Sequence, residues 1–331
     1  MNFIMYYYYL ILISISFIFL NKFFLKKRFL INESGDSHQK FTTIRKVPLS
    51  GGLLFFLSFL FLIKFENQGL LLVLFLFLIL GIFSDLKIIV SAKIKLLTQF
   101  LVITIYIIFF DLTLNFTKIE FLDNLLNIKL FNYFFLIFCI LVIVNGSNFF
   151  DGLNTLNIFY FILITLVLIF LNLTNEVFLE DNVLFNLLLL LIVLYFFNLF
   201  DQCFLGDSGS YLLGLVFSLL LINIYNSNNS LSPFFIILLL WYPGFENLFS
   251  IIRKKMLHRS LMKPDTNHLH QLIFYELKKK FKINIFFVNL ISAHLINLYN
   301  FIVFIVATHN YQDSKFQISL IMLNLTVYTF I

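Results

Sequence analysis

The sequence predicts an all-α fold, a polytopic bundle of about eleven membrane-spanning helices that forms one integral-membrane domain over residues 1–331. Hydrophobic residues make up 61% of the chain and charged residues 12%, against roughly 25% charged in soluble domains. The mean hydropathy is +0.97. Only helices and closed barrels satisfy every backbone hydrogen bond in lipid, and the apolar runs have the length of helices.

Apolar segments separated by short polar interruptions follow one another along the whole chain. A helix needs about 20 apolar residues to cross a bilayer, and several of these runs approach that length. The first run has basic residues only after its apolar stretch and lacks a small-residue cleavage signal, so we expect a retained helix rather than a signal peptide. The expected spans are residues 2–20, 48–63, 69–84, 96–114, 131–147, 154–172, 184–200, 209–225, 233–251, 284–306 and 315–331.

The distribution of lysine and arginine predicts the orientation, because these residues accumulate in cytoplasmic loops. Nineteen of the 23 basic residues lie in one alternate set of loops, and the opposite set holds only four. We therefore expect the N-terminus outside and the C-terminus in the cytoplasm. The expected cytoplasmic loops cover approximately residues 21–47, 85–95, 148–153, 201–208 and 252–283.

Two glycine-containing breaks between apolar runs carry carboxylates and carboxamides. They read Asn145-Gly-Ser-Asn148-Phe-Phe-Asp151-Gly152 and Phe204-Leu-Gly-Asp207-Ser-Gly209-Ser. An ionised side chain near hydrocarbon is costly unless it faces a cavity, a metal or a partner. Asp85 belongs to a third break on the same predicted face. Because all three breaks lie on the basic, cytoplasmic face, we expect them to surround one site.

The residues of these breaks offer hard oxygen ligands without a pair of thiolates. Cys139 and Cys203 are not spaced as a disulfide framework or a paired metal site. Oxygen ligands favour Mg²⁺, with Mn²⁺ as the alternative, and substrate phosphates complete the coordination. Carboxylates beside basic groups are typical of phosphoryl transfer. The expected oxygen ligands are Asp85, Asn148, Asp151 and Asp207, and the expected cationic rim is Lys93, Lys95, Arg253, Arg259, His268 and His270.

Five sequence blocks follow one another along the chain. They are Pro48-Leu-Ser-Gly51-Gly52, Asp85 with Lys95 and Gln99, Asn145-x-x-Asn148-x-x-Asp151-Gly152, Phe204-Leu-Gly-Asp207-Ser-Gly-Ser and Pro264-Asp265-Thr-Asn-His268-Leu-His270. In content and order these blocks resemble the polyprenyl-phosphate N-acetylhexosamine-1-phosphate transferases, glycosyltransferase family 4. The last block is closer to the branch that loads GlcNAc-1-phosphate on undecaprenyl phosphate than to the phospho-MurNAc-pentapeptide branch.

The resemblance implies that undecaprenyl phosphate attacks the β-phosphorus of a UDP-N-acetylhexosamine and releases UMP, in the first membrane step of a cell-envelope glycan pathway. It implies Asn148 and Asp207 as the metal-facing pair, and Asp85 and Asp151 as catalytic acids near the acceptor phosphate. It also implies a Mg²⁺-dependent enzyme of the bacterial inner membrane with a cytoplasmic active site. Membrane lipids are further expected partners, no nucleic acid is expected, and a homodimer is left open. The implied substrate contacts are Lys95, Asn145, Arg259, His268 and His270.

Several alternatives stay open. The family usually has two adjacent aspartates where this chain has Ser84-Asp85, and Asn154 replaces a common aspartate, which is compatible with an inactive paralogue. Phospho-MurNAc-pentapeptide translocase activity and a secondary transporter, in which intramembrane acids mark an ion path, are further alternatives. Taken singly, Asp85 can cap a helix end, and Asn148 and Asp151 can join helices by hydrogen bonds.

Two local structures are also expected from the sequence. Pro243-Gly244 is expected to break one helix and to open a groove for the lipid. His268 and His270 are expected in an extended loop, with both rings on the same side.

Overall fold

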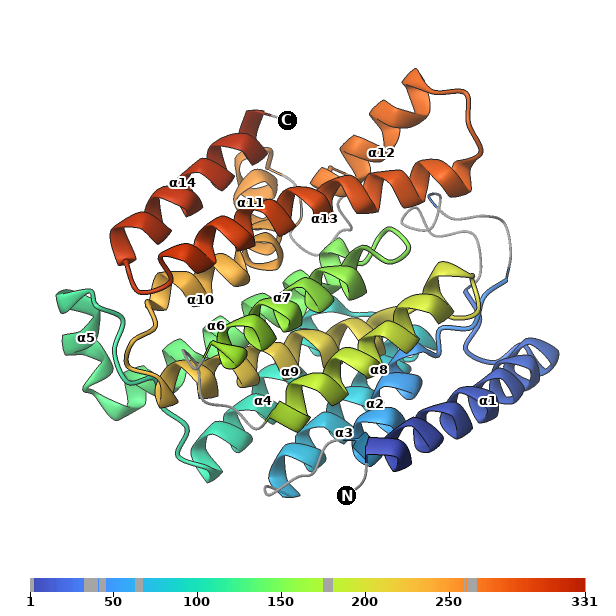
Figure 1. The fold of residues 1–331 in the computed structure, drawn as a ribbon, viewed down its shortest axis with the longest axis horizontal. Coiled ribbons are helices and arrows are strands. Elements are labelled where there is room, and N and C mark those ends of the chain that lie inside the picture. The colour runs from blue at the N-terminus through green and yellow to red at the C-terminus, as the bar shows by residue number, and fades with distance from the viewer. Residues whose placement is uncertain are drawn as a thin grey trace.

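The computed structural model describes residues 3–32, 41, 46–62, 68–174, 181–258, 260 and 267–330. Within these ranges the chain forms 14 α-helices and no β-strand, and one isolated bridge pairs Ile31 with Pro48 (Figure 1). The helices are α1 (Phe3–Lys27), α2 (Gly51–Leu62), α3 (Gln68–Asp85), α4 (Ala92–Phe109), α5 (Glu120–Leu126), α6 (Lys129–Phe150), α7 (Leu156–Leu173), α8 (Asp181–Leu199), α9 (Gly206–Ser227), α10 (Pro233–Leu239), α11 (Trp241–Met256), α12 (Leu269–Lys280), α13 (Ile285–His309) and α14 (Ser314–Phe330).

Each predicted span overlaps one of these helices or the pair α10 and α11. Among the described helices, seven are long and apolar enough to cross a membrane, and the bent pair α10–α11 makes an eighth if it is counted as one span. The seven are α1, α3, α4, α6, α7, α9 and α13. The described structure is therefore all-helical and consistent with a polytopic membrane protein. The count of about eleven spans and their orientation stay predictions.

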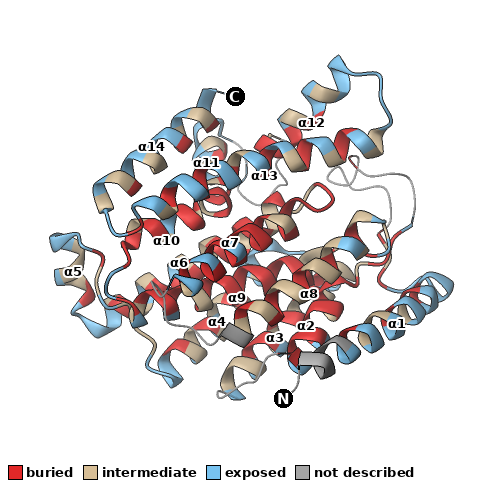
Figure 2. Ribbon diagram, viewed as in Figure 1, coloured by how far each residue is buried: buried red, intermediate tan, exposed pale blue. Residues whose placement is uncertain are grey.

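Helix α9 lies at the centre of the bundle. It packs against α2, α3 and α6, and 83% of the residues in its apolar 18-residue stretch are buried. Figure 2 shows the same contrast, with buried residues concentrated in the central helices and exposed ones along α1 and α5. Glycine allows the close packing, because a Cβ on Gly81 of α3 would lie only 2.1 Å from the Cα of Ser208 on α9. The start of α9 is thereby held against the end of α3.

The pair α10 and α11 bends by 76°. The break lies at Leu240, whereas the sequence placed it at Pro243-Gly244, which the structure puts inside the first turn of α11. The physical cause is still Pro243, because a proline has no N–H to donate and its ring clashes with the carbonyl four residues earlier. That carbonyl belongs to Leu239, and it accepts a hydrogen bond of 2.9 Å from the Tyr160 hydroxyl on α7.

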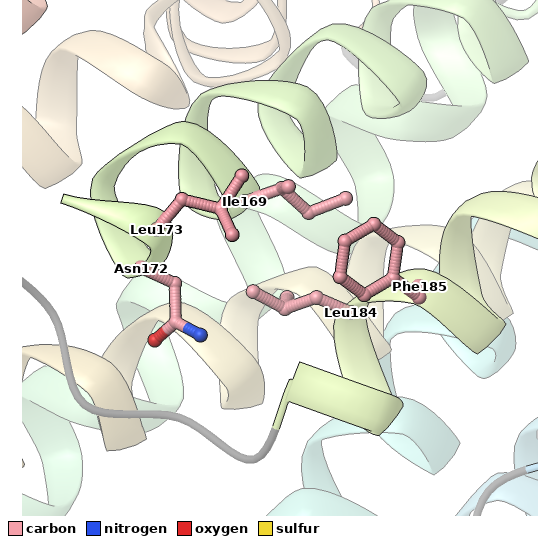
Figure 3. Close-up of a pocket in the computed structure, with 5 residues that line it drawn as sticks. All are labelled: Ile169, Asn172, Leu173, Leu184 and Phe185. Atoms are coloured by element: carbon pink, nitrogen blue, oxygen red, sulfur yellow. The ribbon is translucent and has the colours of Figure 1, made fainter. Parts of the chain in front are cut away.

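Helix α5 lies at the end of the bundle opposite α12 (Figure 1). There Asn132 Oδ1 of α6 accepts a hydrogen bond of 2.8 Å from Leu114 N, in the loop between α4 and α5. A small, mostly apolar hollow lies between the end of α7 and the start of α8, lined by Ile169, Asn172, Leu173, Leu184 and Phe185 (Figure 3). The predicted site residues Asp151 and Asp207 lie near the other ends of these two helices, before the start of α7 and after the end of α8.

Candidate functional site

Asp85, the last residue of α3, accepts hydrogen bonds from the start of α9. Its Oδ1 accepts from Asp207 N at 2.8 Å and its Oδ2 from Ser208 N at 3.2 Å. Amides in the first turn of a helix have no partner inside that helix. Gly206 has a φ of +67°, and a Cβ there would lie 2.7 Å from Asp85 Oδ2. Asp85 therefore caps a helix, as one alternative from the sequence had it, but the capped helix is the neighbouring α9.

Asp207 receives its hydrogen bonds on one carboxylate oxygen. Lys95 Nζ donates to Oδ2 at 3.0 Å, the Ser84 hydroxyl donates to the same atom, and the Tyr211 hydroxyl lies 3.4 Å from it. The other oxygen, Oδ1, accepts no hydrogen bond from the described residues, and the side chain is 25% exposed. One oxygen is thus held by the protein, and the other is available to a ligand.

Asn148 and Asp151 come from the end of α6 and meet α9 through two hydroxyl groups. Ser210 Oγ lies 3.3 Å from Asn148 Oδ1 and 3.4 Å from Asp151 Oδ2. The Tyr211 hydroxyl lies 3.5 Å from Asn148 Nδ2, and it also contacts Asp207. Asn148 and Asp207, the predicted metal-facing pair, therefore share Tyr211 as a neighbour.

The cluster has more negative than positive charge. Burial, together with the nearby carboxylates of Asp207 and Asp85, raises the pKa of Asp151 well above its usual value. Lys95 is the cation that forms an ion pair with this cluster in the described structure. No three His, Cys, Asp or Glu side chains among the described residues lie close enough to hold a metal ion by themselves. The oxygen donors fit Mg²⁺ bound by one or two side chains and completed by phosphate oxygens, since Mg²⁺ is often held in this way.

A second polar cluster lies beside the loop that follows α6. Glu246 of α11 is fully buried, its Oε2 lies 2.8 Å from His268 Nδ1, and its Oε1 accepts from Leu269 N at 3.0 Å. The rings of His268 and His270 stack in parallel with centroids 5.7 Å apart. A Cβ on Gly152 would lie 2.3 Å from His270 Nε2, so this ring packs directly on the residue after Asp151.

The two histidines do not lie in an extended loop. His268 is the residue that caps α12, in a capping box with Gln271, and His270 lies in the first turn of that helix. Capping satisfies amides that a helix start leaves free, so these residues begin a helix where the sequence predicted irregular structure. The sequence predicted both rings on the same side of an extended loop. The rings do lie next to each other, although the backbone here is the start of a helix.

The remaining predicted site residues have different surroundings. Asn145 Nδ2 donates to Gln99 Oε1 at 2.9 Å, which joins α6 to α4 beside the cluster. Arg259 lies outside the described residues, as do Pro264 and Asp265 of the last sequence block. The structure thus brings Asp85, Lys95, Asn148, Asp151 and Asp207 into one cluster and His268 and His270 into an adjacent one, while their chemical roles stay predictions.

Residues 67–225 match the family model of glycosyl transferase family 4. The matched stretch is just under half of the chain, and it contains every residue of the cluster around Asp207. The match supports the glycosyl transferase family 4 superfamily and a transferase activity in general. It ends within α9, before the Glu246 and histidine cluster. No curated protein gives a significant match.

Four residues of the two clusters were not predicted as site residues: Ser84, Ser210, Tyr211 and Glu246. Ser210 and Tyr211 lie three and four positions after Asp207, a spacing that shares one face of a helix, so this signal was present once Asp207 is known to be helical. Ser84 was noted in the sequence only as a departure from the family pattern, and Glu246 is another departure, because the family tends to use aspartate at this position. Asn154, a third departure, lies away from the cluster and donates to Asp201 Oδ1 at 2.8 Å.

Proposed function

We propose that the chain transfers an N-acetylhexosamine-1-phosphate from a UDP-sugar to undecaprenyl phosphate and releases UMP, in the first membrane step of a cell-envelope glycan pathway. The convergence of Asp207, Asn148 and Asp151 at one end of a bundle of apolar helices carries the proposal. The family match over the same residues supports it. Positioned anionic ligands and cations are the means by which proteins stabilise phosphoryl transfer, which requires little covalent chemistry from the protein.

The proposed roles follow from the contacts. Mg²⁺, or Mn²⁺ in its place, would be held by Asp207 and Asn148, and when bound it would neutralise charge on the phosphates. Asp151 would lie beside the acceptor phosphate. Lys95, which contacts Asp207 at 3.0 Å, would compensate charge and contact the diphosphate. For Asp85 we propose a place behind Asp207 rather than on the acceptor, because both of its oxygens accept amides of α9.

The donor would bind on the side of the histidines. His270 packs on Gly152, next to Asp151, so a sugar or phosphate held there would lie beside the acidic cluster. Asn145 and Arg259 would provide further substrate contacts. With the orientation predicted from the basic residues, this end faces the cytoplasm of a bacterial inner membrane, where UDP-sugars are available, and the lipid would enter between helices.

The test measures UMP release by the full chain in detergent micelles or nanodiscs with undecaprenyl phosphate and a panel of UDP-sugars, followed by mass analysis of the lipid product. We expect release with a UDP-N-acetylhexosamine, its loss after chelation of divalent ions, and recovery with Mg²⁺. Asp207→Asn should reduce release by at least about 100-fold, because the altered group has lost its charge as a ligand.

The matched control is Asp111→Asn. Asp111 is also an aspartate paired with a lysine, but it is exposed and lies at the opposite end of α4 from Lys95. This variant should keep its activity. Full activity of Asp207→Asn would contradict the metal assignment, and metal-dependent binding of UDP-sugars without any turnover would favour the inactive paralogue.

A further inference from the structure

We propose that Ser84 and Asp85, the last two residues of α3, are positioning residues that fix Asp207 so that its Oδ1 faces the divalent cation. The inference rests on the proposed function, because it takes Asp207 as a metal-facing group. It assigns to Ser84 a role that the sequence did not predict, and it gives Asp85 a role that acts through Asp207.

The two residues hold Asp207 at two separate points. Asp85 accepts from the backbone amide of Asp207 at 2.8 Å, and the Ser84 hydroxyl donates to Asp207 Oδ2. A residue held at both its backbone and one carboxylate oxygen has little freedom to rotate its side chain. The Ser84 hydroxyl bonds to a carboxylate that is paired with Lys95, and hydrogen bonds to an ionised group are stronger than neutral ones, so this contact is suited to the task. Oδ1, which accepts no hydrogen bond from the described residues, is left in a defined direction.

The backbone geometry allows this double contact. Gly81 lies about one turn before Ser84, and a Cβ on it would be 2.1 Å from Ser208 Cα. Gly206 has a φ of +67°, a region that L side chains rarely adopt, and leaves room for the Asp85 carboxylate. The absence of two side chains thus brings the end of α3 to the first turn of α9. The short Ser84 side chain reaches Asp207 because the backbones are this close.

The contacts of Asp85 also argue against a direct role on the substrate. If its carboxylate turned toward a substrate phosphate, the amides of Asp207 and Ser208 would lose their acceptors. Unpaired buried amides are costly. Ser84, by contrast, is 7% exposed and adds a donor without adding charge to a cluster that already contains three carboxylates.

The test compares Ser84→Ala, Ser84→Thr and Asp85→Asn with the unchanged chain. Mn²⁺ binding is measured by electron paramagnetic resonance on the full chain in detergent with saturating UDP, whose phosphate oxygens can complete the coordination, and thermal unfolding is followed in the same samples. Ser84→Ala and Asp85→Asn should weaken Mn²⁺ binding by roughly 10-fold or more, as is typical when a group that orients a metal ligand is removed. Ser84→Thr keeps the hydroxyl and should restore the affinity of the unchanged chain. Ser218→Ala is the control, because Ser218 is a buried serine of α9 whose hydroxyl bonds, among the described residues, only to Gly214 O.

The outcomes separate this inference from the proposed function. If Asp207→Asn loses Mn²⁺ binding while Ser84→Ala and Asp85→Asn keep it, the positioning role is overturned and the metal assignment survives. A lower unfolding temperature with unchanged Mn²⁺ affinity shows a purely structural role and also overturns the inference. If the unchanged chain binds no Mn²⁺, or Asp207→Asn binds it equally well, the metal assignment of the proposed function fails and the inference fails with it.

Discussion

Replacing Gly81 by alanine is the most direct test of the close packing between α3 and α9. In most helices this change is favourable, because alanine is better than glycine in a helix interior by about 0.5–1 kcal/mol. Here the added Cβ would lie 2.1 Å from Ser208 Cα and 2.5 Å from Ser208 N. Both neighbours are backbone atoms, which cannot rotate away. The sign of the effect should therefore reverse.

The magnitude follows from these distances. Carbon atoms in contact are about 3.5–4.0 Å apart, so α3 and α9 would have to separate by roughly 1.4 Å or more. Overpacking of this kind costs about 1–3 kcal/mol of stability. The same displacement would stretch the bond from Asp207 N to Asp85 Oδ1, now 2.8 Å, beyond hydrogen-bond range. Hydrogen bonds to charged groups contribute about 1.5–3 kcal/mol, so UMP release should fall about tenfold or more.

The assay measures thermal unfolding in detergent and UMP release with the same preparations. Gly244→Ala is the matched control, because a Cβ at Gly244 would meet only Ile143 Cδ1, at an ordinary distance of 3.5 Å. This variant should be as stable as the unchanged chain or more so. If Gly81→Ala unfolds at the same temperature as Gly244→Ala and retains full activity, the close approach of α3 and α9 is wrong.

Two further substitutions test other contacts. Tyr160→Phe removes the donor to the buried Leu239 carbonyl and should lower stability by about 1–3 kcal/mol, measured by thermal unfolding; an effect no larger than that of Tyr8→Phe, at a residue that is 67% exposed, would show that this carbonyl needs no partner. Glu246→Gln replaces the carboxylate that contacts His268 Nδ1 and Leu269 N by an amide, which has only one acceptor oxygen. The start of α12, which contains both residues, should therefore shift. The KM for the UDP-sugar should then rise while Mn²⁺ affinity stays unchanged; an unaltered KM would separate Glu246 from donor binding.

The positions of the apolar helices could be predicted from the sequence, because an apolar run in lipid has few alternatives to a helix. Helices α5 and α12 were not predicted, because they lie in the polar stretches between the apolar runs. The ends of the helices could not be predicted. The sequence predicted a cytoplasmic loop over residues 201–208, yet Asp207 lies in the first turn of α9. The cap that stabilises this start is Asp85, which lies 122 positions earlier in the chain. No local pattern can reveal a cap supplied by another helix.

The membership of the site was also predictable only in part. The acids and amides of the breaks could be grouped because they share one predicted face of the membrane. Their hydroxyl neighbours could not, since serine and tyrosine are common in apolar helices and carry no signal by themselves. Ser210 and Tyr211 became informative only through the helical position of Asp207. Glu246 could not be assigned to the site either, because its partner His268 reaches it only through the start of α12, a helix that the sequence did not predict.

The bend between α10 and α11 has a mechanical consequence. Straightening the pair would gain no bond from Pro243 to the Leu239 carbonyl, because Pro243 has no N–H, and it would endanger the bond that Tyr160 already makes to that carbonyl. The bend is therefore held by contacts within the protein itself. If the lipid enters between helices as proposed, its chain would contact a surface whose shape does not depend on the lipid.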